Sequence, residues 1–109
     1  MPARLKVLNA AELEGADTKA LVKHYLAVLE TRAPGKSVEV RVPPFAAVQA
    51  IPGVRHTRGT PPAVIETDAA TWLDLATGRT TWHEAVDAGR VSASGERTDL
   101  TPWLPLGPA

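Results

Sequence analysis

The sequence predicts an α+β fold, in which helices cover a mostly antiparallel sheet of about four to five strands. Its 109 residues suit one domain, so we expect residues 1–109 to fold as a single unit. Some segments have apolar residues at helical spacing, whereas others alternate apolar and polar residues as half-buried strands do. Because the two kinds of segment do not alternate regularly, a doubly wound parallel sheet is disfavoured.

Two helices are expected before the first strand. Asn9 is followed three residues later by Glu12, a pair that can cap a short helical turn ending at Gly15. Asp17 offers a second N-cap, and the apolar residues of the segment 18–32 gather on one side of a helix. The second helix is therefore amphipathic and is expected to lie against another layer of the fold.

Three strands are expected next. Residues 37–42 alternate strictly between valine and polar or charged residues, which predicts a half-buried strand with a wet outer face. Residues 45–51 are apolar on both faces apart from Gln49, so we expect this strand to be covered on both sides. Residues 63–67 form a further short strand.

The C-terminal half contains signals for two helices, a strand and a last helical turn. Asp68 can cap a helix over residues 69–77, which Gly78 can close in the left-handed conformation. Thr81 and Glu84 form a capping box for the next helix. We expect that helix to end at Ala88. A strand over residues 91–94 and a helical turn beginning at Thr101 are expected after it.

Composition excludes several classes of function. Twelve Lys and Arg balance twelve Asp and Glu, so the chain has no net field to attract nucleic acid or an anionic membrane. The absence of cysteine excludes a disulfide scaffold, a thiolate zinc site and a thiol nucleophile. No apolar run approaches the roughly 18 residues of a transmembrane segment, and the first residues lack the apolar core of a signal peptide. We therefore expect a cytoplasmic protein that binds no nucleic acid.

The polar residues do not assemble into a recognisable catalytic or metal motif. His24, His56 and His83 have no helical metal-site spacing, and we expect His24 and His83 at the surface. The segment 92–95 is the nearest approach to a nucleophile elbow, but it lacks the first glycine of Gly-x-Ser-x-Gly. No glycine-rich phosphate loop is present. The sequence thus predicts no metal, no cofactor and no enzymatic activity.

A set of glycines and basic residues near the C-terminus has a distinctive spacing. The set comprises Gly78-Arg79, Ala85, Gly89-Arg90-Val91 and Gly95. It resembles the C-terminal signature of the sterol carrier protein type 2 (SCP2) family. The preceding segment 64–75, with Trp72, is similar to the strand and the aromatic-leucine helix before that signature. The resemblance is good over residues 62–106, and the N-terminal half agrees in the order of its elements.

The whole chain looks like a bacterial branch of this family, on the segments 45–49 and 56–62. A similar domain forms the C-terminal part of mycothiol-dependent maleylpyruvate isomerases. The resemblance implies an SCP2-like sandwich with an apolar space between sheet and helices that accepts a fatty acyl, acyl-CoA or sterol-like ligand. Because the tail contains Pro105, Gly107 and Pro108, it cannot form a long lid helix. We therefore expect an open groove rather than a closed tunnel.

The resemblance suggests which residues would form this groove. Its expected apolar lining is Phe45, Val48, Ile51, Trp72, Leu75, Trp82 and Val86. Its expected polar mouth is Arg55, His56 and Arg58, because arginine forks suit carboxylate or phosphate groups. The simpler interpretations are a solvated loop at the mouth, and tryptophans that fill the core.

Two functions are consistent with these observations. The first is a non-catalytic module that binds a lipid or acyl ligand in the hydrophobic groove. The second is a stand-alone accessory domain, similar to the C-terminal part of the thiol-dependent isomerases, which has no ligand of its own. A protein partner or a homodimer is compatible with either function. A continuous apolar cavity between the helix at residues 18–32 and the sheet would favour the first.

Overall fold

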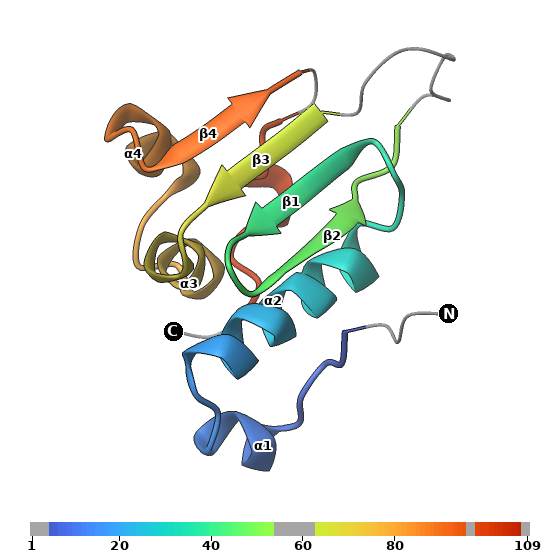
Figure 1. Ribbon diagram of the computed structural model, residues 1–109, viewed down its shortest axis with the longest axis vertical. Helices are drawn as coiled ribbons and strands as arrows, with labels where there is room; N and C mark the ends of the chain where they lie inside the picture. The colour runs from blue at the N-terminus through green and yellow to red at the C-terminus, as the bar shows by residue number, and fades with distance from the viewer. Residues whose placement is uncertain (1–4, 54–62, 96–97, 108–109) are drawn as a thin grey trace.

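Four strands form one mixed sheet in the computed structural model, which describes residues 5–53, 63–95 and 98–107 (Figure 1). The strands are β1 (Val38–Val42), β2 (Ala46–Ala50), β3 (Ala63–Thr67) and β4 (Val91–Ser94), in the spatial order β2-β1-β3-β4. The outer strands β2 and β4 pair antiparallel to their neighbours, whereas β1 and β3 are parallel. The predicted α+β class and mostly antiparallel sheet are confirmed.

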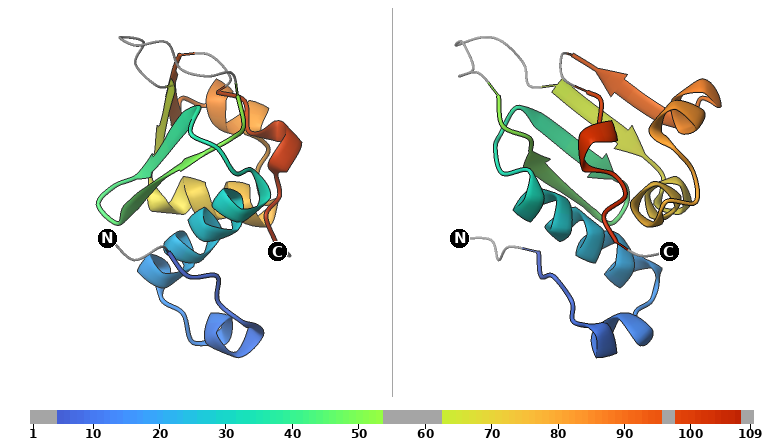
Figure 2. Two further views of the ribbon diagram at one scale, coloured as in Figure 1. Left: turned by 90° about the vertical axis from the view of Figure 1, so that its right-hand side faces the viewer. Right: turned by 180° about the vertical axis from the view of Figure 1, so that it is seen from behind.

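The helices lie on one side of this sheet. They are α1 (Ala10–Glu14), α2 (Thr18–Arg32), α3 (Ala69–Thr77), α4 (Trp82–Asp87) and the 3-10 turn η1 (Thr101–Trp103). Figure 2 shows α2, α3 and η1 stacked against one face of the sheet, with α1 beyond α2. No described helix covers the opposite face, where the side chains of Arg41, Ala47, Gln49 and Glu66 are exposed. The prediction that the segment 45–51 is covered on both sides is therefore wrong.

Local signals place the ends of the helices, as predicted. Asn9 and Glu12 form the capping box of α1, and Thr81 and Glu84 form that of α4. Asp17 caps α2, because its carboxylate accepts the backbone N–H of Ala20 at 2.9 Å. These contacts join residues three apart and depend on no other part of the fold, so the sequence alone contains the signal.

The core lies between α2, α3 and the inner face of the sheet. Val22, Leu26 and Leu29 of α2 are fully buried, and so are the three valines of β1. Trp72 of α3 is also fully buried, and its indole N–H donates to the backbone carbonyl of Val22 at 3.3 Å. The interface between α2 and the sheet is thus closely packed, as protein interiors usually are.

The N-cap of α3 leads to a prediction about stability and pH. The Asp68 carboxylate accepts the backbone N–H of Thr71 at 2.7 Å, and this hydrogen bond is the main cause that holds the pKa of Asp68 below its ordinary value. Replacing Asp68 by Ala should lower the free energy of unfolding by about 1 kcal/mol at pH 7. This carboxyl binds its proton less readily in the folded chain than in the unfolded chain. The contribution of the Asp68 cap to the free energy of unfolding is therefore complete above the ordinary pKa, and it is lost as the pH falls through the lowered pKa.

Urea denaturation of the native chain and of D68A at pH 7 and pH 3 checks this prediction. The stability difference between the two proteins should narrow at pH 3. Asp68→Asn is the matched control, because an amide oxygen caps a helix without titrating in this range. An equal difference at both pH values would contradict the role given to the Asp68 carboxylate.

Candidate functional site

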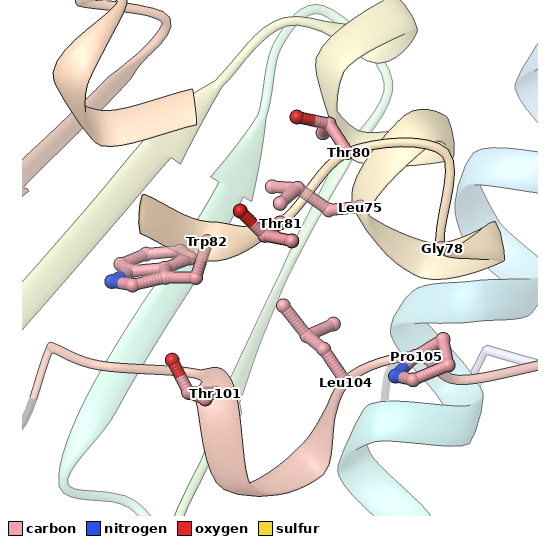
Figure 3. Close-up of a pocket in the computed structure, with 8 residues that line it drawn as sticks. All are labelled: Leu75, Gly78, Thr80, Thr81, Trp82, Thr101, Leu104 and Pro105. Carbon is pink, nitrogen blue, oxygen red and sulfur yellow. The ribbon is translucent and has the colours of Figure 1, made fainter. Parts of the chain in front are cut away.

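An apolar pocket of about 260 Å³ opens to solvent between the α3–α4 connection and the C-terminal segment (Figure 3). Its lining residues come from α3, the connection, α4 and the segment around η1: Leu75, Gly78, Thr80, Thr81, Trp82, Thr101, Leu104 and Pro105. Figure 3 shows Leu104 pointing across this space toward Thr81 and Leu75, with the Trp82 ring to one side. The pocket therefore brings together residues from two distant stretches of the chain.

The α3–α4 connection forms one wall of the pocket. Its course is set by the residue that ends α3 and the residue that begins α4. Gly78 closes α3 in the left-handed conformation (φ +82°), and its backbone N–H bonds back to the last turn. Thr81 then starts α4, because its hydroxyl accepts the backbone N–H of Glu84 at 3.1 Å. Trp82 is the first residue of α4, so the capping box fixes the position of the indole on the pocket wall.

The C-terminal segment forms the opposite wall and is held at several points. The backbone N–H groups of Leu106 and Gly107 both donate to the carbonyl of Ala76, at 2.8 and 3.2 Å. The Arg32 guanidinium donates to the carbonyl of Pro105 at 3.0 Å. Leu104 lies just before these anchors, and its side chain is half-buried at the pocket.

The pocket is chemically simple. The polar side-chain groups of its lining residues are the hydroxyls of Thr80, Thr81 and Thr101 and the Trp82 indole N–H, and the Thr81 hydroxyl is already engaged as a helix cap. None of the described lining side chains is ionisable. The pocket can therefore shelter a hydrocarbon group from water, and its lining offers no nucleophile and base for covalent chemistry.

The structure places only some of the expected lining residues at this pocket. Leu75 and Trp82 line it, whereas Val86 of α4 is 41% exposed and does not. Leu75 and Trp82 also belong to the buried core, together with Val48, Ile51 and Trp72, and Phe45 packs against it. The expected mouth residues Arg55, His56 and Arg58 lie outside the described residues. Leu104 and Pro105 were not expected as lining residues. The sequence of an irregular, proline-rich segment does not show which helix the segment packs against.

Ile51 is buried at the end of β2, where its backbone is held by three hydrogen bonds. It has a positive φ of 73°, which is unusual for a β-branched residue. Its backbone N–H donates to Ala33 at 2.6 Å, and its carbonyl accepts both the N–H and the hydroxyl of Ser37, at 3.2 and 2.6 Å. These bonds fasten the end of β2 to the loop after α2.

The basic residues of the glycine-rich signature connect elements of the fold. The Arg90 side chain donates through Nε to the buried Thr71 hydroxyl at 3.0 Å and through its terminal nitrogen to Asp74 at 3.2 Å. Arg79 lies 3.9 Å from the other Asp74 oxygen and is largely exposed. Arg90 thus ties the start of β4 to α3, so its role in the fold is structural.

His24 is a buried residue that the sequence did not reveal. It is 6% exposed, and its Nδ1 accepts the backbone N–H of Leu8 at 2.9 Å. The prediction that His24 lies at the surface is therefore wrong, whereas His83 is exposed as expected. The error arises because the cover comes from a segment 16 residues away, which no local pattern shows.

A search for other kinds of site gives two negative findings. Within residues 5–53, 63–95 and 98–107, no group of three or more His, Cys, Asp or Glu side chains is placed to hold a metal ion. Across the same ranges, no helix has both the length and the apolar character that crossing a bilayer requires.

Comparison with known proteins identifies the family. The family model described as bacterial SCP ortholog matches residues 14–106, which include the whole sheet and every lining residue of the pocket. A search among curated proteins gives no match. The resemblance found in the glycine-rich signature is confirmed, and the chain belongs to the SCP2-like family of bacterial SCP orthologs.

Proposed function

We propose that the chain is a non-catalytic, cytoplasmic binding module for apolar ligands, and that the pocket beside Trp82 and Leu104 receives their hydrocarbon end. The observation that carries this proposal is a solvent-open pocket whose described lining has no ionisable side chain. Membership of the SCP family supports a carrier function of this kind. Fatty acyl chains and similar lipids are the ligands that this chemistry suits.

The volume of the pocket limits how large a ligand it can enclose. About 260 Å³ is slightly below the roughly 300–1,000 Å³ of pockets that enclose a drug-sized molecule. A short alkyl chain or the end of a longer chain fits this description better than a whole sterol. The rest of a longer ligand would lie along the surface. The assignment of an anionic head group to Arg55, His56 and Arg58 stays a prediction.

A chain-length series tests whether the pocket binds hydrocarbon. Each buried methylene contributes about 0.8 kcal/mol, so affinity for linear alcohols should rise about fourfold per carbon and then level off once the pocket is full. The measurement is an NMR titration that follows the Trp82 indole N–H and the Leu104 amide. A flat affinity across the series, or no saturable shift at either group, would contradict the proposal.

Filling the pocket with a protein side chain should abolish ligand binding. Leu104→Trp places an indole in the pocket, and the affinity for the best alcohol should fall at least tenfold, which is about 1.4 kcal/mol. Val86→Trp is the matched control, because Val86 is exposed on α4 and does not line the pocket. The proposal fails if the two folded variants lose affinity equally, or if neither does.

The second candidate is an accessory domain that has no ligand of its own. The full burial of Val22, Leu26 and Leu29 favours it, because these side chains of α2, which packs on β2 and α3, leave no exposed surface for a ligand. Such a domain would work together with a protein that supplies the active site. A specific partner that co-purifies with an empty chain, as judged by native mass spectrometry, would favour this candidate over the first.

A further inference from the structure

The segment before α2 is attached to the rest of the molecule in an unusual way. Residues 5–14, which we call the N-terminal arm, run beside α2 and end in α1 at the edge of the molecule (Figures 1 and 2). No residue of α1 is buried, and Val7 is 47% exposed. Leu5 packs against the core, and the backbone N–H of Leu8 donates to His24 Nδ1.

Most of the arm lies outside the stretch that matches the family model. Residues 5–13 precede the stretch that matches the bacterial SCP family, whereas α2 with His24 lies inside that stretch. An isolated five-residue helix has little stability in water, and α1 buries no side chain that would compensate. The position of the arm therefore depends strongly on its contacts at Leu5 and Leu8.

The contact at Leu8 constrains the protonation state of His24. A ring nitrogen that accepts an N–H cannot carry a proton, so the imidazole is neutral and its hydrogen is on Nε2. Protonation of Nδ1 would turn the acceptor into a second donor, pointing at the Leu8 N–H over 2.9 Å. It would also leave a charged imidazole covered by the arm and in T-shaped contact with the Tyr25 ring, with 4.7 Å between the ring centroids.

We propose that the N-terminal arm is a pH-sensitive strap, which His24 holds against α2 when neutral and releases when protonated. Release removes the clash between two donors and returns the imidazolium to water. Burial is the cause that holds the pKa of His24 below its ordinary value. The attached state therefore binds the proton less readily than the detached state, so lowering the pH from above about 6.5 through the lowered pKa favours detachment.

Among the described residues, the charged groups of the arm and of α2 offer no other explanation for this titration. On the arm, Lys6 and Glu12 pair with each other, with 2.7 Å between Nζ and Oε2. On α2, Lys23 and Tyr25 are the sequence neighbours of His24, and the Tyr25 ring lies close to Gly107 of the C-terminal segment. Hydrogen bonding to the backbone of Asn9 is the main cause of the lowered pKa of Glu12, which therefore stays ionised across the range in which histidine titrates.

The test is an NMR titration of the untagged full chain between pH 8 and pH 5. Backbone order parameters of residues 5–9 should fall from about 0.85 to below about 0.6, with the same midpoint as the His24 ring signals. His24→Gln should keep the arm ordered at both pH values, because its amide oxygen can accept the Leu8 N–H without titrating. His83→Gln, at an exposed histidine, should leave the transition unchanged.

Several outcomes would overturn the proposal. They are an arm that is mobile at pH 8, an arm that is equally ordered at pH 8 and pH 5, and a transition that persists in H24Q. If H24Q does not fold or cannot hold the arm at any pH, the test is the comparison, in the native chain, of the midpoint of the arm transition with the midpoint of the His24 ring titration. Midpoints for the arm and the His24 ring that differ by more than about one pH unit then contradict the strap.

Discussion

Replacing Trp72 by Ala is expected to lower the free energy of unfolding by about 3–5 kcal/mol. The Trp72 side chain is fully buried, and its N–H bonds to the Val22 carbonyl, so it joins α3 to α2. The substitution leaves a large cavity between the two helices. Because a small domain is usually stable by only about 5–15 kcal/mol, this loss would remove a large share of the free energy of unfolding. Urea denaturation followed by circular dichroism measures this loss.

Trp103→Phe is the control for the Trp72 variant, because Trp103 is only partly buried in η1. It should cost less than about 1.5 kcal/mol. A W72A protein that is as stable as W103F would mean that α2 and α3 are held together mainly by other contacts.

Gly35→Ala is expected to destabilise the chain by roughly 3 kcal/mol or more. Gly35 has φ +154°, and an added Cβ would lie 2.2 Å from the carbonyl oxygen of Ile51. This carbonyl cannot easily move, because it accepts two hydrogen bonds from Ser37. Backbone strain of about 1–3 kcal/mol and the loss of hydrogen bonds worth about 1 kcal/mol each would add together.

Gly15→Ala is the matched control for the Gly35 variant. Gly15 has φ −98° and nothing within 4 Å of an added Cβ, so alanine should be neutral or slightly stabilising there. Urea denaturation of both variants checks the comparison. Equal stability of G35A and G15A would contradict the close approach between the loop after α2 and the end of β2.

The sequence predicted the features of the fold that depend on nearby residues. Each helix cap joins residues three apart, and the alternation in β1 appears directly in the burial of its residues. The same local pattern could not show that β2 is an outer strand with an open face, because Ala47 has the same polarity on either side of a sheet. Whether a face of the sheet is buried depends on how many helices the chain contains and on which face of the sheet they pack.

The candidate site was harder to predict, because it depends on a long-range return of the chain. Leu75 and Trp82 were expected to line a groove between the helices and the sheet, and both line the pocket beside the C-terminal segment. That arrangement follows from the bonds of Leu106 and Gly107 to Ala76, which join residues about thirty positions apart. The sequence of the segment, with Pro105 at its centre, has no periodicity that would reveal this partner.

An NMR titration of the native chain with 1-octanol shows directly whether the pocket binds hydrocarbon. Saturable shifts are expected at the Trp82 indole N–H and at the amides of Thr101 and Leu104, with little change at β1. Shifts concentrated on α2 and the inner face of β1 would place the ligand in the interface that the structure fills with side chains. That result, or the absence of any saturable shift, would contradict the assignment of the pocket as the binding site.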